Sequence, residues 1–192
     1  MQTPDSFGTI GSTIKVAAGH YVDLVNPDPA TLDLETIAAA LGKLCRFGGH
    51  TCQFYSVAEH SWMCCRLANY DECPEEVMRA VLLHDAAEAY LGDIVKPLKL
   101  LLPEYCRLEE RMERAIMERF DVDLVGHADK IRAYDRQMLK VERNALLTED
   151  NEPWADFDTI PDRNVDLAFY SPIQAASRFL SVAASLGVEL GE

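Results

Sequence analysis

The chain has 192 residues, of which 48% are apolar and 26% charged, and its formal net charge at pH 7 is −14. This length predicts a single domain, spanning residues 1–192, with its own hydrophobic core. Nucleic-acid polymers and anionic membranes both require a basic face, so the acidic balance argues against either as a partner. No apolar run reaches the roughly 20 residues that a membrane span requires.

The cysteine pattern predicts a reducing compartment. None of the cysteines forms a C-x-x-C pair, and the N-terminus has no basic stretch followed by an apolar one, as a secretory signal would. We therefore expect a cytoplasmic protein with reduced thiols, most of them small buried side chains. The cysteines are Cys45, Cys52, Cys64, Cys65, Cys73 and Cys106.

The first quarter of the chain predicts a hairpin and one helix. Residues 12–17 and 21–25 flank a turn that contains glycine, which is typical of a small N-terminal hairpin. From residue 34 to 45 the apolar side chains follow helical spacing. The pair Gly48-Gly49 is expected to end that helix.

The remaining elements are predicted to be helical. The run Ser56-Val57-Ala58-Glu59 has the form of a capping box, which places His60 in the first turn of a helix that reaches about Asn69. Pro74 fits a first helical position and Gly92 the residue after a helix end. Three further helices are expected at about 103–120, 126–147 and 172–186, with an irregular acidic stretch between the last two. The sequence thus predicts an all-α fold of about six helices.

Three polar side chains interrupt the apolar helix predicted over residues 74–91. His84, Asp85 and Glu88 fall on one helical face, because residues three and four apart are neighbours on a helix. Burying an imidazole and two carboxylates costs several kcal/mol unless something compensates them. A bound cation is the simplest compensation.

Two more candidate ligands lie on other predicted helices. His60 taken alone is more often an ordinary surface or core histidine, and Asp135 fits either a solvated charge or the inward edge of its helix. Together with His84 and Asp85 they give two imidazoles and two carboxylates on three helices. That donor set suits a divalent ion with open coordination positions, such as Mn, Fe, Co, Ni, Zn or Mg.

The order His, His-Asp, Asp resembles the HD-domain metal-dependent phosphohydrolases, which are helical bundles. The local sequence from Tyr55 to Ser61 and from His84 to Asp93 is similar to the bacterial 5′-deoxynucleotidase branch. It is also similar to the small phage-type deoxyadenosine triphosphohydrolases of that branch. The resemblance extends from about residue 24 to 147, most of the chain.

The resemblance implies a role for each matching residue. His60, His84, Asp85 and Asp135 would be the metal ligands. Glu88 would orient or deprotonate the attacking water, and Asp93 would be a second acid near the reacting phosphate. Arg46 and Phe47 would contact the nucleotide. It also implies a homo-oligomer, since relatives of this branch assemble as dimers or larger rings.

Two lysines also bear on the substrate. Lys96 and Lys99 lie just past Gly92-Asp93 and are either phosphate contacts or solvated lysines. Our first interpretation is hydrolysis of dATP to deoxynucleoside and triphosphate. The alternatives are a 5′-deoxynucleotidase that releases phosphate from dNMPs, and a non-catalytic HD module that senses a nucleotide.

Overall fold

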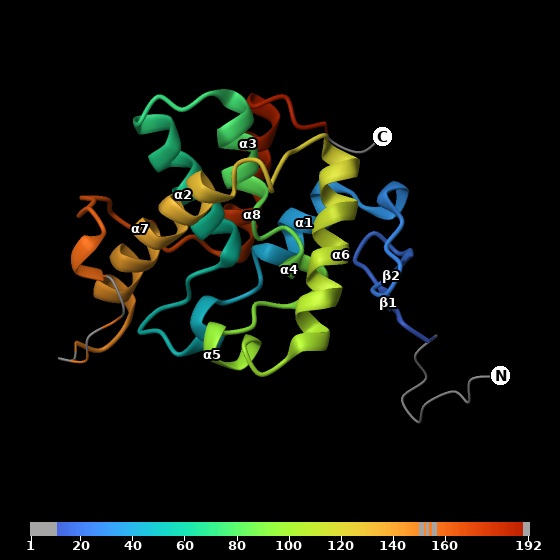
Figure 1. The fold of residues 1–192 in the computed structure, drawn as a ribbon, viewed down its shortest axis with the longest axis horizontal. Coiled ribbons are helices and arrows are strands. Elements are labelled where there is room, and N and C mark those ends of the chain that lie inside the picture. Colours follow the sequence, from blue (N-terminus) through green and yellow to red (C-terminus); the bar gives the residue numbers. More distant parts are fainter. Residues whose placement is uncertain (1–10, 150–151, 153, 155–156, 190–192) are drawn as a thin grey trace.

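The computed structural model describes residues 11–149, 152, 154 and 157–189. In this part of the chain eight α-helices, three short 3-10 helices and one two-stranded hairpin form the regular structure (Figure 1). The α-helices are α1 (Leu34–Leu41), α2 (Val57–Tyr70), α3 (Glu75–Leu83), α4 (Glu88–Leu91), α5 (Lys96–Lys99), α6 (Pro103–Phe120), α7 (Ala128–Leu146) and α8 (Pro172–Ser185). The all-α prediction is confirmed, and six of these helices have eight residues or more. No described helix is both long and apolar enough to cross a membrane.

The predicted N-terminal hairpin is present. Strands β1 (Thr13–Lys15) and β2 (Tyr21–Asp23) pair antiparallel, with Ile14 opposite Val22. Val22 is fully buried and belongs to the main core, so one face of the hairpin is anchored to the helices. The short helix η1 (Pro29–Thr31) follows and contacts α6.

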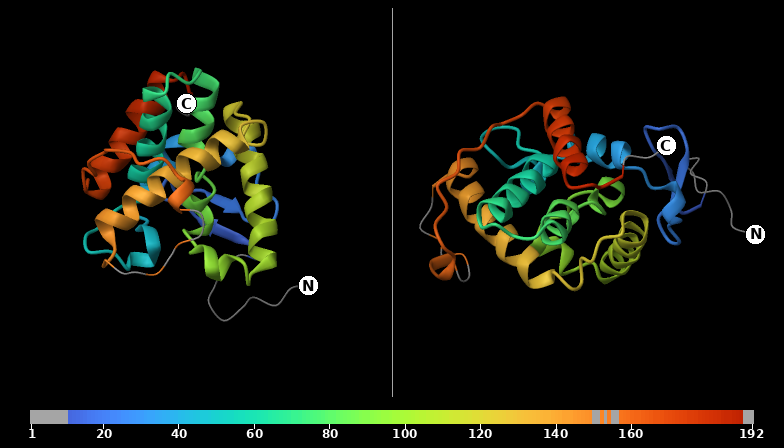
Figure 2. Two further views of the ribbon diagram at one scale, coloured as in Figure 1. Left: turned by 60° about the vertical axis from the view of Figure 1, so that its left-hand side comes forward. Right: turned by 90° about the horizontal axis from the view of Figure 1, so that it is seen from above.

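Helix α2 lies at the centre of the bundle, with α3, α7 and α8 packed around it (Figure 2). Every residue from Val57 to Cys65 is buried. A helix that is covered on all sides is expected to be apolar throughout, yet this one includes Glu59, His60 and Ser61. Each of these polar side chains therefore needs a partner inside the protein.

The hydrogen bonds at the start of α2 show how Glu59 is satisfied. The Ser56 hydroxyl caps the helix by accepting the Glu59 N–H at 3.1 Å, as predicted. The reciprocal half of the capping box is not formed. The Glu59 carboxylate instead accepts the backbone N–H groups of Ala168, Phe169 and Tyr170 at 2.8, 2.9 and 2.8 Å. Glu59 thus fixes the segment that leads into α8.

Helix α1 is shorter than its apolar stripe predicted. It ends at Leu41, and Cys45 lies beyond it in a single antiparallel bridge with Ser56. A Cβ atom on Gly42 would lie only 2.5 Å from the carbonyl oxygen of Pro172, so the backbones of α1 and α8 approach closely at this glycine. The chain leaves α1 there and turns towards the start of α2.

The prediction of a single helix over residues 74–91 is wrong. Residues 84–87 form a turn that separates α3 from α4. In this turn the N–H groups of Ala86 and Glu88 bond to carbonyls three residues earlier, not four as in an α-helix. Glu88 consequently begins a new, four-residue helix.

A side chain accounts for this break. Nδ1 of His84 lies 2.8 Å from the carbonyl oxygen of Val81. In a continuous α-helix that carbonyl would accept the N–H of Asp85. The imidazole takes up the same acceptor and favours the tighter turn, as polar side chains that bond to nearby backbone do. His84 and Asp85 therefore project from the end of α3.

The remaining elements follow the predicted boundaries closely. Helix α6 begins and ends where expected, α7 begins two residues later than 126, and α8 is capped by Ser171. The described residues between α7 and α8 are irregular apart from η3 (Phe157–Thr159). Helix α5 was not predicted, because its four residues are too few to show a helical pattern.

Candidate metal centre

The first imidazole of the site lies on α2. His60 is fully buried, and its Nδ1 is 2.5 Å from an Oε atom of Glu142. Its Nε2 faces two other carboxylates, at 3.6 Å from Asp85 and 3.4 Å from Asp135. Burial and Arg46 act to lower the pKa of His60, but the surrounding acidic groups raise it well above its ordinary value. The position next to Nε2 therefore favours a positive charge, either a proton or a metal ion.

The second imidazole comes from the end of α3. The rings of His84 and His60 have their centroids 5.4 Å apart. Because Nδ1 of His84 donates to the Val81 carbonyl, the lone pair of the neutral ring is on Nε2. This Nε2 is buried, makes no hydrogen bond, and lies 3.2 Å from a carboxylate oxygen of Asp85. A buried ring nitrogen without a hydrogen-bond partner is a feature of metal ligands.

The two aspartates complete the predicted donor set. Asp85 Oδ2 lies between both imidazoles, and Asp135 on α7 reaches the same point with a side chain that is 38% exposed. Burial acts to raise the pKa of both carboxyls, but His84 and His60 hold the pKa of Asp85, and His60 that of Asp135, below the usual value. The structure thus brings together the four residues that the sequence singled out.

Sequence reasoning assigned no role to Glu142, which is central to this geometry. It is fully buried on α7 and accepts both the Nδ1 proton of His60 and the Nε–H of Arg46, the latter at 3.1 Å. Burial acts to raise the pKa of Glu142, but Arg46 and His60 lower it, so the side chain is a carboxylate. The sequence feature that could have indicated a role for Glu142 is its position seven residues after Asp135, on the apolar stripe of the helix.

With both imidazoles neutral, the charges of this cluster do not balance without a cation. In the absence of a metal ion they balance when His60 and His84 are both protonated, which the neighbouring acidic groups favour by raising the pKa of each. Asp85, Asp135 and Glu142 contribute three negative charges, and Arg46 contributes one positive charge, with its NH1 at 3.5 Å from Asp85. Two negative charges remain in a mostly buried site. A divalent ion offsets that deficit and takes the place of the protons on His60 and His84. The donor set of two imidazoles and two carboxylates fits such an ion.

Arg46 reaches the site from a strained turn that also includes Phe47. The helix η2 (Arg46–Gly49) includes Phe47 with a φ of 56°, in the left-handed region that side chains other than glycine rarely adopt. The Arg46 guanidinium lies 5.7 Å from the centroid of the Phe47 ring. Strain of this kind is retained where the surrounding structure requires it, often at functional sites.

Glu88 and Asp93 form the acidic side of the site. Glu88 is 9% exposed, and its Oε2 is buried without a hydrogen bond. Burial, with help from Asp85 and Asp93, raises the pKa of Glu88 well above its ordinary value. Burial also raises the pKa of Asp93. Carboxyl groups with raised pKa values are suited to proton transfer near neutral pH.

The two predicted phosphate-binding lysines are placed differently. Lys99 is half-buried and pairs with Glu109 of α6 at 2.5 Å. Lys96, at the start of α5, is exposed. The carboxyl of Glu113 also lies on this side of α6, and burial together with Glu109 raises its pKa to about 7. The surroundings of Lys99 are therefore more acidic than the sequence indicated.

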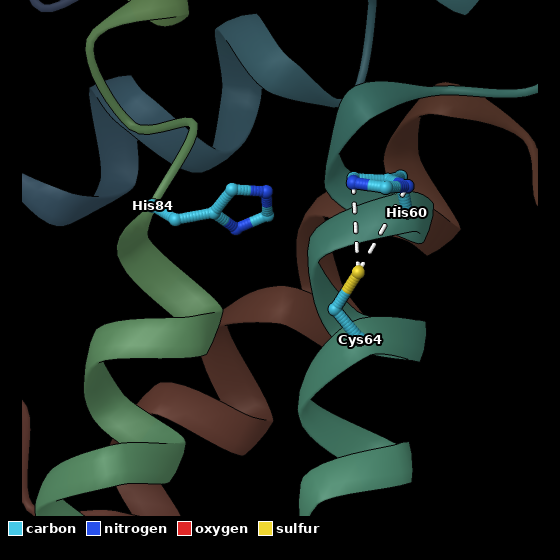
Figure 3. A group of neighbouring side chains, drawn as sticks. All are labelled: His60, Cys64 and His84. Atoms are coloured by element: carbon cyan, nitrogen blue, oxygen red, sulfur yellow. Dashed lines mark hydrogen bonds between the residues drawn. The ribbon is translucent and has the colours of Figure 1, made fainter. Parts of the chain in front are cut away.

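A cysteine forms a further part of the site. The sulfur of Cys64 lies 3.5 Å from Nε2 of His60 and 4.0 Å from its Nδ1. Figure 3 shows the His84 ring reaching from the end of α3 towards His60, with the Cys64 sulfur directed to the same ring from one turn along α2. The thiol is fully buried, and burial raises its pKa to about 11. Sequence reasoning had counted it among the inert core cysteines.

Comparison with known proteins identifies the family. The family model described as HD domain matches residues 49–139, a range that includes all four predicted ligands and excludes Arg46 and Glu142. YfdR, an uncharacterized protein of Escherichia coli strain K12, is 38% identical over 152 residues, which are 78% of this chain and 81% of YfdR. The chain belongs to the HD-domain family.

A second relative is similar over a shorter part of the chain. It is an uncharacterized protein of Rhodobacter capsulatus that is 36% identical over 125 residues, 62% of this chain and 63% of its own length. HD domains bind divalent metals and typically act as metal-dependent phosphohydrolases, so the family indicates that general class of activity. Neither relative carries a named substrate.

Proposed function

We propose that residues 1–192 form a single HD-type domain that hydrolyses deoxynucleotide phosphates with a divalent metal ion. The observation that carries this proposal is the convergence of His60, His84, Asp85 and Asp135 around a charge deficit of two. These four residues would hold the ion. When bound, the ion would lower the pKa of a coordinated water and offset charge on a phosphoryl group. Mn, Co, Fe, Ni, Zn and Mg all suit this donor set.

Two carboxyl groups of the chain supply the proton chemistry in this proposal. As water attacks phosphorus, Glu88 in its carboxylate form accepts the water proton, because a raised pKa makes that carboxylate a stronger base. The phosphorus–oxygen bond to the leaving group breaks, and Asp93 returns a proton to the departing oxygen. The remaining contribution is positioning, on which phosphoryl transfer depends more than on covalent chemistry.

On the substrate side we assign Arg46, Phe47, Lys96 and Lys99 to the nucleotide. Arg46 presents a planar fork suited to a phosphate or a base edge, and Phe47 offers a half-buried ring beside it. Our first choice is dATP, cleaved to deoxynucleoside and triphosphate. The similarity of the run from Tyr55 to Val57 to the phage-type triphosphohydrolases supports this choice.

One observation favours a second candidate, a 5′-deoxynucleotidase that acts on dNMPs. Lys99 is already paired with Glu109, so fewer free cations border the site than β and γ phosphates would need. A non-catalytic, nucleotide-sensing HD module is less well supported. Such a module has no use for Glu88, whose buried and unpaired carboxyl is costly to keep.

The test is a substrate panel. Metal-free protein is loaded with Mn²⁺ or Co²⁺ and incubated with dNTPs, NTPs and dNMPs, and the products are separated by chromatography. Triphosphate and deoxyadenosine formed only from dATP support the first choice. Phosphate released from dNMPs alone supports the second. If no deoxynucleotide is cleaved, or if Asp85→Asn cleaves as fast as the unchanged protein, the enzymatic proposal is wrong.

We further propose that the protein acts in the cytoplasm as a homo-oligomer. The reduced state of the cysteines, all six of which are free, supports the first part. The second part rests on the resemblance to the oligomeric 5′-deoxynucleotidase branch.

A further inference from the structure

The carboxyl of Asp93 has no hydrogen-bond or ion-pair partner in the part of the chain that the structure describes. The residue is half-buried, and its charge interacts with those of Arg46 and Glu88. A carboxyl that exchanges a proton with one oxygen of a substrate needs a fixed direction. For Asp93 that direction comes from the backbone that carries it.

Gly92, the residue before Asp93, is held from both sides. Its N–H donates to the carbonyl of Glu88 at 2.7 Å, and its own carbonyl accepts the hydroxyl of Tyr105 at 2.8 Å. Its φ of 85° lies in the left-handed region that favours glycine. Because the peptide group is planar, fixing the Gly92 carbonyl also fixes the nitrogen and Cα atoms of Asp93. A hydroxyl on α6 thus acts on the direction of Asp93.

The ring of Tyr105 makes a separate contact. Nζ of Lys99 lies 5.9 Å from the centroid of this ring, within the range of a cation–π interaction, and pairs with Glu109 at 2.5 Å. The thiol of the next residue, Cys106, lies 3.7 Å from the Lys99 carbonyl. The first turn of α6 therefore contacts both the Gly92 turn and the end of α5, which lies at the same end of the molecule (Figure 1).

We propose that Tyr105 is a positioning residue of the candidate site, whose hydroxyl orients the turn that carries Asp93 and whose ring holds Lys99. This inference rests on the proposed function, which assigns Asp93 to proton transfer and Lys99 to the substrate. The two contacts use different atoms of one side chain, so they can be removed one at a time. Tyr105→Phe keeps the ring and loses the hydrogen bond, whereas Tyr105→Leu loses both.

Amide hydrogen exchange tests the contact of the hydroxyl without using activity. The Gly92 N–H is bonded to Glu88, so its exchange requires the turn to open. We expect exchange, measured by NMR, to be roughly 10-fold faster in Tyr105→Phe, the scale on which one hydrogen bond contributes to stability. Tyr70→Phe is the matched control, because it removes a hydroxyl that accepts from Arg66 at 3.2 Å, far along α2 from His60. Unchanged exchange in Tyr105→Phe would overturn the proposal.

Hydrolysis kinetics separate positioning from a merely structural role. Tyr105→Phe should lower kcat roughly 10-fold and leave KM and metal affinity unchanged, because a small displacement of Asp93 affects the reaction and not binding. Tyr105→Leu should lower kcat by the same factor and also raise KM, because Lys99 loses the ring. Chelator competition measures the metal affinity, and thermal unfolding confirms that each variant is folded.

Two other outcomes are distinguishable. If Tyr105→Phe and the unchanged protein have equal kcat values, the positioning role is wrong and the proposed function stands. If the unchanged protein cleaves no deoxynucleotide while exchange at Gly92 still rises in Tyr105→Phe, the proposed function is wrong, and with it the catalytic purpose of Tyr105.

Discussion

Two buried glutamates, Glu59 on α2 and Glu88 on α4, are in opposite situations. Glu59 is fully buried and accepts three backbone N–H groups, whereas Glu88 is nearly as buried and leaves an oxygen without a hydrogen bond. Burial raises the pKa of both. At Glu59 the three amides oppose that effect, whereas at Glu88 the charges of Asp85 and Asp93 add to it.

The difference indicates what each carboxyl does. A buried carboxylate with every partner in place stabilises the fold and has nothing left to offer a ligand. A buried carboxyl without partners lowers stability, and it is retained where chemistry needs it. In this molecule the first kind lies between α2 and the segment before α8, and the second kind lies beside the candidate metal centre.

The largest expected effect is on turnover. Glu88→Gln should reduce hydrolysis roughly 10²–10⁴-fold, because it removes the proton acceptor. The melting temperature should stay the same or rise, since a neutral amide replaces a poorly paired acid. Turnover with saturating metal and thermal unfolding measure the two effects. A variant that keeps full turnover would show that Glu88 is buried for another reason.

At Glu59 we expect the opposite result, a loss of stability with unchanged turnover. Glu59→Gln should lower the free energy of unfolding by roughly 2–4 kcal/mol, because the amide cannot satisfy three N–H donors. Turnover per folded molecule should not change. Denaturant unfolding measures the loss, with Glu35→Gln on the exposed face of α1 as the control. Equal stability of both variants would contradict the structural role of Glu59.

Glu142 resembles Glu59 in having hydrogen-bond partners, and it resembles Glu88 in lying at the candidate site, because its partners are His60 and Arg46. Glu142→Gln should weaken metal binding roughly 10–100-fold, since His60 loses the carboxylate that orients its ring. Competition with a chelator measures the affinity, and Glu149→Gln, an exposed change just after α7, is the control. Unchanged affinity would show that Glu142 acts only in packing.

The smallest expected effect concerns pH. Burial and Glu109 raise the pKa of Glu113 to about 7 in the folded protein. The folded state therefore holds this proton more tightly than the unfolded state, and stability falls as pH rises towards 7. Glu113→Gln should be more stable than the unchanged protein at pH 8 by about 1 kcal/mol, after allowing for solvent screening, with little difference at pH 4. Urea unfolding at both pH values, with Glu110→Gln as control, measures it.

Much of the fold could be predicted because its signals are local. The caps at Ser56 and Ser171 and the long amphipathic stripes of α6 and α7 reproduce the helices that the structure shows. The break after α3 could not be predicted from periodicity, because it depends on one imidazole bonding to a carbonyl three residues before it. Helix α1 ends at Leu41, and the close approach of the next residue, Gly42, to Pro172 far along the chain is not encoded in any local pattern.

The residues of the site also divide into those that the sequence could predict and those that it could not. His84 and Asp85 could be singled out from the sequence, because adjacent polar residues on an apolar stretch are conspicuous, whereas His60 and Asp135 were assigned through the resemblance to the HD-domain family. Cys64 and Glu142 were not, because a cysteine or an acid on an inward stripe has no meaning until its neighbours are known. Their contribution depends on distances between α2 and α7, which no spacing in the sequence encodes.

The three backbone hydrogen bonds that Glu59 accepts also affect how the protein unfolds locally. The amides of residues 168–170 lie outside any helix or strand, where hydrogen exchange with solvent is usually fast. Here they donate to the Glu59 carboxylate inside the central helix, next to the candidate ligand His60. We therefore expect their exchange to require the start of α2 to separate from the segment before α8, so that these three amides report the opening of the helix beside the candidate metal centre.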